Sequence, residues 1–183
     1  MTRLAVSLLP IVILFAGCTG PIETRVQTVS SAQSAKPISF HFLDVAAPNP
    51  QISNLTQREL RQALEAKGYL ESKSASILLS SSIANRPASI AIQLGEGENA
   101  RTVTSTKANK LFQSCKDREH RLIVTMVQRD SGAQLYRGTA SEYHCKADLT
   151  LSLPHLVKAA LSDLGQSSNG EDHQKVLERR GID

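Results

Sequence analysis

The clearest structural signal in the sequence is RLIVTMVQRDSGAQLYRGTASEY, residues 121–143. Apolar and polar residues alternate in two runs, 121–129 and 133–143, and alternation with a period of two predicts β-strands. The two runs flank the sequence DSG, whose glycine can adopt the positive φ of a three-residue hairpin loop. If Arg129 lies opposite Ala133, the numbers of opposed residues add up to about 262 along the ladder. We therefore predict a long β-hairpin.

Two cysteines, Cys115 and Cys145, lie just beyond the open end of this hairpin. The same register brings them close together, so a disulfide between them is expected to staple that end and to contribute about 3–4 kcal/mol. A zinc site that also used His120 and His144 is the alternative. We reject it, and expect no metal, because the adjacent residues His144 and Cys145 point to opposite faces of a strand.

The third cysteine, Cys18, follows a segment with the features of a secretory signal. In residues 1–17, Arg3 supplies the positive charge, LAVSLLPIVILFA supplies an apolar run too short to span a bilayer, and two small residues precede the cysteine. The sequence FAGC resembles a lipobox, the site at which bacteria attach lipid to an exported protein. The alternative is an ordinary signal peptide followed by a coincidental cysteine.

Lipidation of Cys18 would give the mature protein a diacylglycerol thioether and an acylated amino terminus, with palmitate the expected acyl chain, and several chains anchor a protein stably. It also leaves an even pair of cysteines for an oxidising compartment. Thr19 follows the cysteine, and the resemblance to enterobacterial lipoproteins implies the outer membrane, because Asp in that place is their usual inner-membrane signal. We expect an outer-membrane lipoprotein that faces the periplasm.

The rest of the chain alternates between strand and helix signals. The sequence LTQRELRQALEAKGY predicts a helix with a Thr56–Glu59 capping box and a terminating Gly68. The sequence SLPHLVKAALSDLG predicts a second helix, capped by Ser152 and ended by Gly165. Further strands are predicted in four segments: 37–45, the region of 77–83, 89–94 and 101–106.

These elements divide the chain into four parts. Residues 1–17 are the signal peptide and 18–36 are a tether, within which IETRVQTV either forms a first strand or does not. Residues 37–165 are the folded domain, and the polar tail 166–183 is expected to be frayed, with at most a short helix. The fold class predicted is α+β: one antiparallel sheet of roughly five to seven strands, with two main helices packed on one face.

Composition narrows the function classes. The chain is 40% hydrophobic and 21% charged, which fits a globular protein. Its formal net charge of +4 is spread along the sequence, with no basic cluster beyond ERR at 178–180. A nucleic-acid partner is excluded for an exported chain. We expect contact with the membrane through the lipid anchor, and with another envelope protein or envelope component.

The order of these elements resembles a family of bacterial envelope lipoproteins known only as a domain of unknown function, DUF four-one-three-six. The similarity spans residues 37–164. The matching positions are Leu60, Leu64, Lys67, Gly68, Tyr69, Asp130, Gly132, Leu135, Tyr136, Arg137, Gly138 and Ala140. The resemblance implies an α+β domain with helices on one face of an antiparallel sheet, and it supplies no catalytic residues.

Motifs of catalysis are weak in this sequence. There is no Gly-x-Ser-x-Gly elbow, TSTK at 104–107 lies on a predicted strand, and Glu96 and Glu98 lie in a predicted turn. We expect no catalytic residue and no cofactor. Tyr136 and Arg137 are candidate partner contacts. The alternative is that Tyr136 caps the core and that Gly138 accommodates close packing.

The sequence therefore predicts a non-enzymatic binding or scaffolding module of the bacterial envelope. The alternative function is an envelope hydrolase whose site is not recognisable from sequence patterns.

Overall fold

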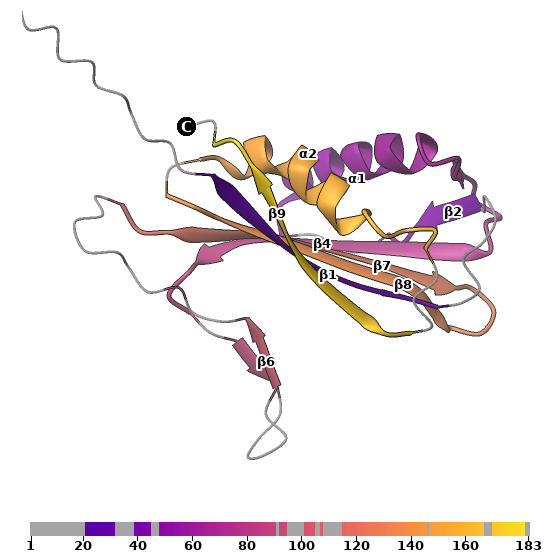
Figure 1. The fold of residues 1–183 in the computed structure, drawn as a ribbon. Helices are drawn as coiled ribbons and strands as arrows, with labels where there is room; N and C mark the ends of the chain where they lie inside the picture. Colours follow the sequence, from indigo (N-terminus) through magenta and orange to yellow (C-terminus); the bar gives the residue numbers. More distant parts are fainter. Residues whose placement is uncertain are drawn as a thin grey trace, which may run out of the picture.

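The computed structural model describes residues 21–31, 39–44, 48–90, 92–94, 101–104, 107, 115–145, 147–166 and 170–181. The order of elements along the chain is β1 (Ile22–Ser30), β2 (Ser39–Phe42), α1 (Pro50–Glu65), β3 (Leu70–Glu71), β4 (Ile77–Pro87), β5 (Ile92–Leu94), β6 (Arg101–Thr104), β7 (Arg118–Gln128), β8 (Gln134–His144), α2 (Leu149–Ala160) and β9 (Asp172–Arg179) (Figure 1). They form an α+β fold.

Seven strands form one sheet in the order β3-β2-β4-β7-β8-β1-β9. The sheet is mixed, which corrects the expectation of an antiparallel one: β2 runs parallel to both β3 and β4, and the other neighbours are antiparallel. The parallel pairs arise because α1 connects β2 to β3, and a helical crossover returns the chain in the same direction.

The predicted hairpin, β7–β8, lies in the middle of this sheet. Leu122 lies opposite Ala140 and Arg118 lies opposite His144, so the predicted register is confirmed. The ladder shifts after Met126, before the turn. The glycine of the turn, Gly132, has a φ of 69°, as its place in the loop requires.

Helix α1 starts earlier than predicted. Its N-cap is Asn49, whose side chain accepts hydrogen bonds from the backbone of Gln51 and Ile52, and Pro50 follows as the first helical residue. Thr56, the predicted cap, is buried inside the helix. The predicted end is confirmed: Gly68 has a φ of 86°, and the backbone N–H of Tyr69 donates to Leu64, as in a Schellman motif.

Helix α2 also starts earlier than predicted, at Leu149, with Asp148 as its N-cap. Ser152, the predicted cap, therefore lies inside the helix and is fully buried. Both caps were misplaced for the same reason: a Ser or Thr near an apolar run resembles a cap, whether or not the chain is already helical before it.

Both helices cover the same face of the sheet (Figure 1). The core between them is mainly aliphatic, with Phe40, Phe42, Tyr69 and Tyr136 as its aromatic side chains. Most of its residues come from the helix-facing positions of β4, β7 and β8 and from α2. We call the opposite side of the sheet the open face, because no helix of the described residues covers it (Figure 1).

Strands β1 and β9 extend the sheet beyond the domain boundaries predicted from sequence. β1 lies within the predicted tether, and it pairs with β8 on one side and with β9 on the other. β9 lies in the tail that was expected to be frayed or partly helical. Its side chains are mostly exposed, so it carries no apolar alternation, and it is held through its backbone pairing with β1.

The region after β4 differs from the sequence prediction in one respect. β4 continues through Asn85, Arg86 and Pro87, beyond the predicted strand region of 77–83, and Pro87 ends it. β5 and β6 form a separate two-stranded sheet that projects from the main one (Figure 1). The predicted turn at GEGEN lies outside the described residues.

Among the residues that the structure describes, neither helix is long and apolar enough to cross a membrane.

Gly138 lies where α2 approaches the sheet most closely. A Cβ atom at this position would overlap the backbone carbonyl oxygen of Ala160, near the C-terminal end of α2. The hydroxyl of Tyr136, which is buried, donates a hydrogen bond of 2.6 Å to the same oxygen. The two residues therefore fix the position of α2 on the sheet, and burial raises the pKa of the Tyr136 hydroxyl, which keeps it a donor.

We predict that Gly138→Ala lowers the free energy of unfolding by about 3 kcal/mol, because α2 must move away from the sheet to admit the methyl group. Urea unfolding followed by circular dichroism measures this. Arg137→Ala is the matched control, because Arg137 is exposed on the open face and its loss should change stability by less than about 0.5 kcal/mol. Equal stability of Gly138→Ala and the wild type would contradict the account.

Candidate functional site

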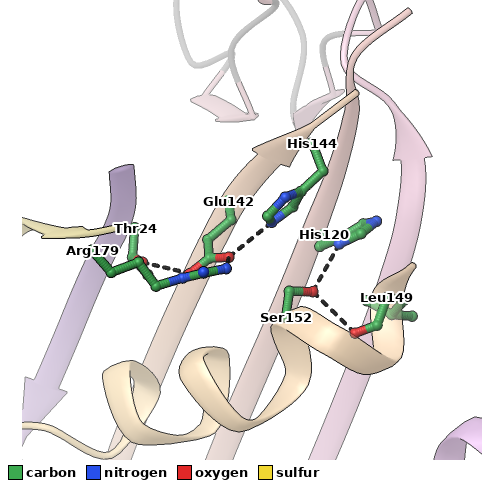
Figure 2. A network of polar contacts seen from close by, with 7 residues as sticks. All are labelled: Thr24, His120, Glu142, His144, Leu149, Ser152 and Arg179. Atoms are coloured by element: carbon green, nitrogen blue, oxygen red, sulfur yellow. Dashed lines mark hydrogen bonds and ion pairs between the residues drawn. The ribbon is translucent and has the colours of Figure 1, made fainter. Parts of the chain in front are cut away.

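A set of buried polar side chains gathers at one end of the sheet, under the first turns of α2 (Figure 2). They come from β1, β7, β8, β9 and α2. We call this set the polar cluster; its members are Thr24, His120, Glu142, His144, Ser152 and Arg179. Five of the six are nearly inaccessible to solvent, and Arg179 is half-buried.

The strand pattern explains why the cluster forms at this end. Every second residue of β7 faces the helices, and this series runs from Met126 through Val124 and Leu122 to His120. The corresponding series in β8 ends in Glu142 and His144. The helix-facing positions thus change from apolar to polar at the end where the hairpin opens, and these polar groups must be satisfied inside the protein.

Glu142 is the centre of one half of the cluster. Its carboxylate accepts hydrogen bonds from the Thr24 hydroxyl at 2.6 Å, from the Arg179 guanidinium at 2.8 and 3.2 Å, and from Nε2 of His144 at 2.8 Å. Burial alone would raise the pKa of Glu142. The three donors outweigh burial and lower this pKa to about 2, so the carboxylate is ionised at neutral pH.

His120 and Ser152 form the other half. The Ser152 hydroxyl donates to the backbone carbonyl of Leu149 at 3.0 Å, so it accepts the proton of His120 Nδ1 across 2.8 Å. His120 Nε2 is buried and has no hydrogen-bond partner among the described residues. Burial, and next to it His144, lowers the pKa of His120 to about 4. The imidazole is therefore neutral at neutral pH.

The two halves meet where the rings of His120 and His144 stack. Their centroids are 4.7 Å apart, with 28° between the ring planes. This contact joins β7 to β8 above the hairpin ladder, and Ser152 and Arg179 attach α2 and β9 to it. Thr24 adds β1, so the cluster ties five elements together through polar contacts where the apolar core ends.

This arrangement does not form a nucleophile. Ser152 is fully buried, and its proton is directed at the Leu149 carbonyl, whereas a general base would have to accept that proton. The Glu142 carboxylate is already bound by three donors. Within the described residues, no group of three or more His, Cys, Asp or Glu side chains is placed to hold a metal ion.

An open hollow of about 500 Å³ lies beside the cluster. It is lined by Pro21, Glu178, Arg179, Arg180 and Gly181. Arg179 is the one member of the polar cluster in this lining, so the hollow does not give access to the histidines or to Ser152.

A second charged group lies on the open face at the same end of the sheet. Glu119 is fully buried there by Arg121, whose guanidinium lies 2.8 Å from the carboxylate, and by Arg86. Next to it, Arg25 and Lys107 lie against the ring of Tyr143, each about 5.0 Å from its centroid. Cationic side chains therefore surround the carboxylate and the ring.

The residues singled out from sequence are placed as follows. A disulfide joins Cys115 to Cys145 at the end of the hairpin beside the polar cluster, with Cα atoms 5.6 Å apart. Tyr136 is buried in the core, which agrees with the alternative interpretation that it caps the core. Arg137 is exposed on the open face. Cys18 lies outside the described residues.

Sequence reasoning considered His120 and His144 only as zinc ligands, and it did not identify the other members of the polar cluster. One signal was available, because His120, Glu142 and His144 continue the helix-facing alternation of the two strands of the hairpin. The contributions of Thr24 and Arg179 could not be seen, because they depend on β1 and β9 joining the sheet.

No family model and no curated protein sequence matches the chain. The fold is similar to that of a PDZ domain protein from Parabacteroides distasonis, with a TM-score of 0.56 and 9% identity. That match covers 85% of this chain but 39% of the other, so the chain spans well under half of that protein's length.

The fold is also similar to that of PelC from Paraburkholderia phytofirmans, crystallised as a dodecamer in two space groups. The TM-scores are 0.50 and 0.51, the identities 15% and 12%, and the matches cover 79% and 78% of this chain and 98% of PelC. Likeness at these identities shows the fold alone. The resemblance to DUF four-one-three-six stays a prediction.

From the polar cluster we predict that the folded state loses stability in acid. As the pH falls from 6.5 toward 4, the unfolded chain takes up a proton at His120 that the folded chain resists, so the folded state loses up to about 3 kcal/mol over this range. The charged and titratable groups that act on His120 include His144, Arg118, Glu142 and Asp148. All of them are also present in the variant His120→Asn, which tests this prediction.

His120→Asn retains a donor for Ser152 but does not titrate, so the loss between pH 6.5 and 4 should be smaller than in the wild type. Urea unfolding at a series of pH values measures it. His173→Asn, which removes an exposed histidine, is the control and should follow the wild-type profile. The same pH dependence in His120→Asn and the wild type would show that His120 does not carry the effect.

Proposed function

We propose that this protein is an outer-membrane lipoprotein facing the periplasm, and that it acts as a non-enzymatic binding or scaffolding module of the bacterial envelope. Its anchor is lipid on Cys18, in the lipobox FAGC. The chain is proposed to be related to the lipoproteins of DUF four-one-three-six, whose pattern it resembles between residues 37 and 164.

The start of the first strand supports a close attachment to the membrane. β1 begins at Ile22, four residues after Cys18, and four extended residues span about 14 Å at most. A lipidated Cys18 would therefore hold the end of the sheet that carries the polar cluster near the bilayer surface. Within the predicted tether, only residues 19–21 separate Cys18 from β1.

The disulfide supports export. Cys115 and Cys145 are joined, and disulfides persist in oxidising compartments such as the periplasm. This leaves Cys18 without a cysteine partner, in agreement with its use for lipid attachment.

The single observation that carries the binding role is the open face of the sheet. A sheet must bury at least one face against another layer. Here both helices cover the same face, and the open face has no helix of the described residues on it (Figure 1). The central positions of the open face on β7 and β8 are half-buried or exposed side chains, among them Ile123, Thr125, Arg137 and Thr139. Such a broad, mixed surface suits a protein or polymer partner.

The polar cluster supports the non-enzymatic assignment. Its carboxylate, its hydroxyls and most of its donors bind one another, so the cluster stabilises the end of the domain instead of presenting reactive groups. A hydrolase would need such groups to converge at an accessible surface.

The anchor is tested by growing cells with a radioactive fatty acid. We expect label on the wild-type protein, no label on Cys18→Ser, and recovery of the wild type in the outer-membrane fraction. Cys115→Ser with Cys145→Ser is the matched control, because it removes two cysteines but leaves the lipobox, and it should still be labelled. Label that survives Cys18→Ser would refute the anchor.

The open face is tested by cross-linking in intact membranes with Arg137→Glu. Reversal of this exposed charge should reduce the yield of any cross-linked partner at least several-fold without changing the melting temperature. Arg58→Glu reverses an exposed charge on α1 and is expected to leave the yield unchanged. An equal yield from both variants would remove Arg137 from the binding surface.

A further inference from the structure

The outer edge of the sheet is an unpaired strand. β9 pairs with β1 at all eight positions from Asp172 to Arg179, without a bulge. No strand of the described residues pairs with its other side. The opposite edge of the sheet, β3, is only two residues long, Leu70–Glu71. A long and regular edge strand offers a row of backbone N–H and C=O groups to a further strand.

The devices that usually protect such an edge are weak in β9. The strand contains no proline and no bulge, and three of its four Asp, Glu, Lys and Arg residues make contacts within the chain, whereas Glu178 is exposed. Lys175 pairs with Asp163, and Arg179 pairs with Glu142. The carboxylate of Asp172 accepts from Gln27 at 2.7 Å. These contacts hold the three charges against β9's own sheet and the turn after α2, leaving its edge accessible.

β9 also exposes two adjacent apolar side chains. Val176 is 57% exposed and Leu177 is 39% exposed, and they rank among the few large apolar residues of the described chain left in solvent. Val176 lies opposite Arg25 and so belongs to the open face, whereas Leu177 lies opposite the buried Thr24, on the helix side. An added strand would cover both, one on each face.

We propose that the outer edge of β9 pairs with β9 of a second copy of this chain, antiparallel and about a two-fold axis perpendicular to the sheet. The two sheets then join into one continuous sheet across the dimer. The occupant is a second copy because the sequence of β9 complements itself.

The two-fold symmetry restricts the register, because a residue can lie opposite its own copy but not opposite a neighbour that faces the other side of the sheet. With Val176 opposite the partner's Val176, Lys175 lies opposite the partner's Leu177 and Gln174 lies opposite the partner's Glu178. At the ends, Asp172 lies opposite the partner's Arg180, which is an opposite-charge pair.

The two neighbouring registers of the β9–β9 pairing place like charges opposite each other. A shift that sets Lys175 opposite the partner's Lys175 also sets Asp172 opposite the partner's Glu178, so that like charges face each other at both places. A shift the other way, with Leu177 at the axis, sets Lys175 opposite the partner's Arg179. The register centred on Val176 is the one of the three that avoids like-charge pairs between lysine, arginine, aspartate and glutamate.

The dimer constrains how two anchored chains would lie on a membrane. The two-fold axis places the β1 starts of the two copies on opposite sides of the axis. Ile22 lies opposite Arg179, three residues from Val176, so the two starts are roughly 20 Å apart measured along the strands. Two lipid anchors reach one bilayer when the sheet lies along its surface. Pairing itself does not depend on the anchor, so it can be tested on the full chain with Cys18→Ser, exported to the periplasm.

Cysteine cross-linking tests the register. In the Cys18→Ser chain, Val176→Cys should form a covalent dimer on mild oxidation, because the two Cβ atoms face each other across the axis. Gln174→Cys is the matched control, two residues away on the same face. Its two copies would lie about 13 Å apart along the strands, too far for a disulfide. Cross-linking of both variants to the same extent would overturn the proposed register.

Sedimentation velocity tests the dimer itself. The Cys18→Ser chain should sediment as a dimer that dissociates on dilution. Val176→Lys places two lysines against each other at the axis and should raise the dissociation constant at least tenfold. Gln174→Lys faces the partner's Glu178 and should leave it unchanged or lower it. A chain that stays monomeric at all concentrations, or a dimer unaffected by Val176→Lys, would overturn the proposal. Either failure would leave the fatty-acid labelling test of Cys18 intact.

Discussion

The close contact between α2 and the sheet at Gly138 determines where α2, the apolar core and the polar cluster lie. The missing side chain at position 138 lets the Ala160 carbonyl rest on the strand, where the Tyr136 hydroxyl binds it at 2.6 Å. This contact fixes the end of α2, and a rigid helix then carries Ser152 to a fixed place above His120. The apolar core and the polar cluster are thus positioned by one approach of backbone to backbone.

The polar cluster is best understood as the polar end of the core. Buried polar groups are costly unless they are satisfied, and here Thr24, Arg179 and His144 satisfy Glu142 while Ser152 satisfies one nitrogen of His120. The ends of β1, β8 and β9 meet at this place. The contacts that offset the free-energy cost of burying these polar groups therefore also hold the terminal strands in the sheet. The disulfide between Cys115 and Cys145 closes this end covalently.

The sequence was informative where local rules decide the structure. The register of β7 and β8, the turn at Gly132 and the helix end at Gly68 follow from alternation and from glycine geometry. The sequence was uninformative where pairing between distant segments of the chain determines the structure. β9 has no apolar pattern, because its pairing with β1 uses the backbone, and the parallel direction of β2 depends on the crossover through α1. The polar cluster combines both cases, since its histidines follow the alternation whereas Arg179 joins it only through β9.

We propose a surface that binds and not a site that reacts, because the buried polar groups bind one another and no helix of the described residues covers the open face of the sheet. The most direct test is photo-cross-linking in living cells, with a photoreactive residue at Thr139 on the open face and, for comparison, at Lys158 on the exposed side of α2. The account predicts a specific adduct from Thr139 and none from Lys158. Adducts from Lys158 alone, or none from Thr139, would contradict it.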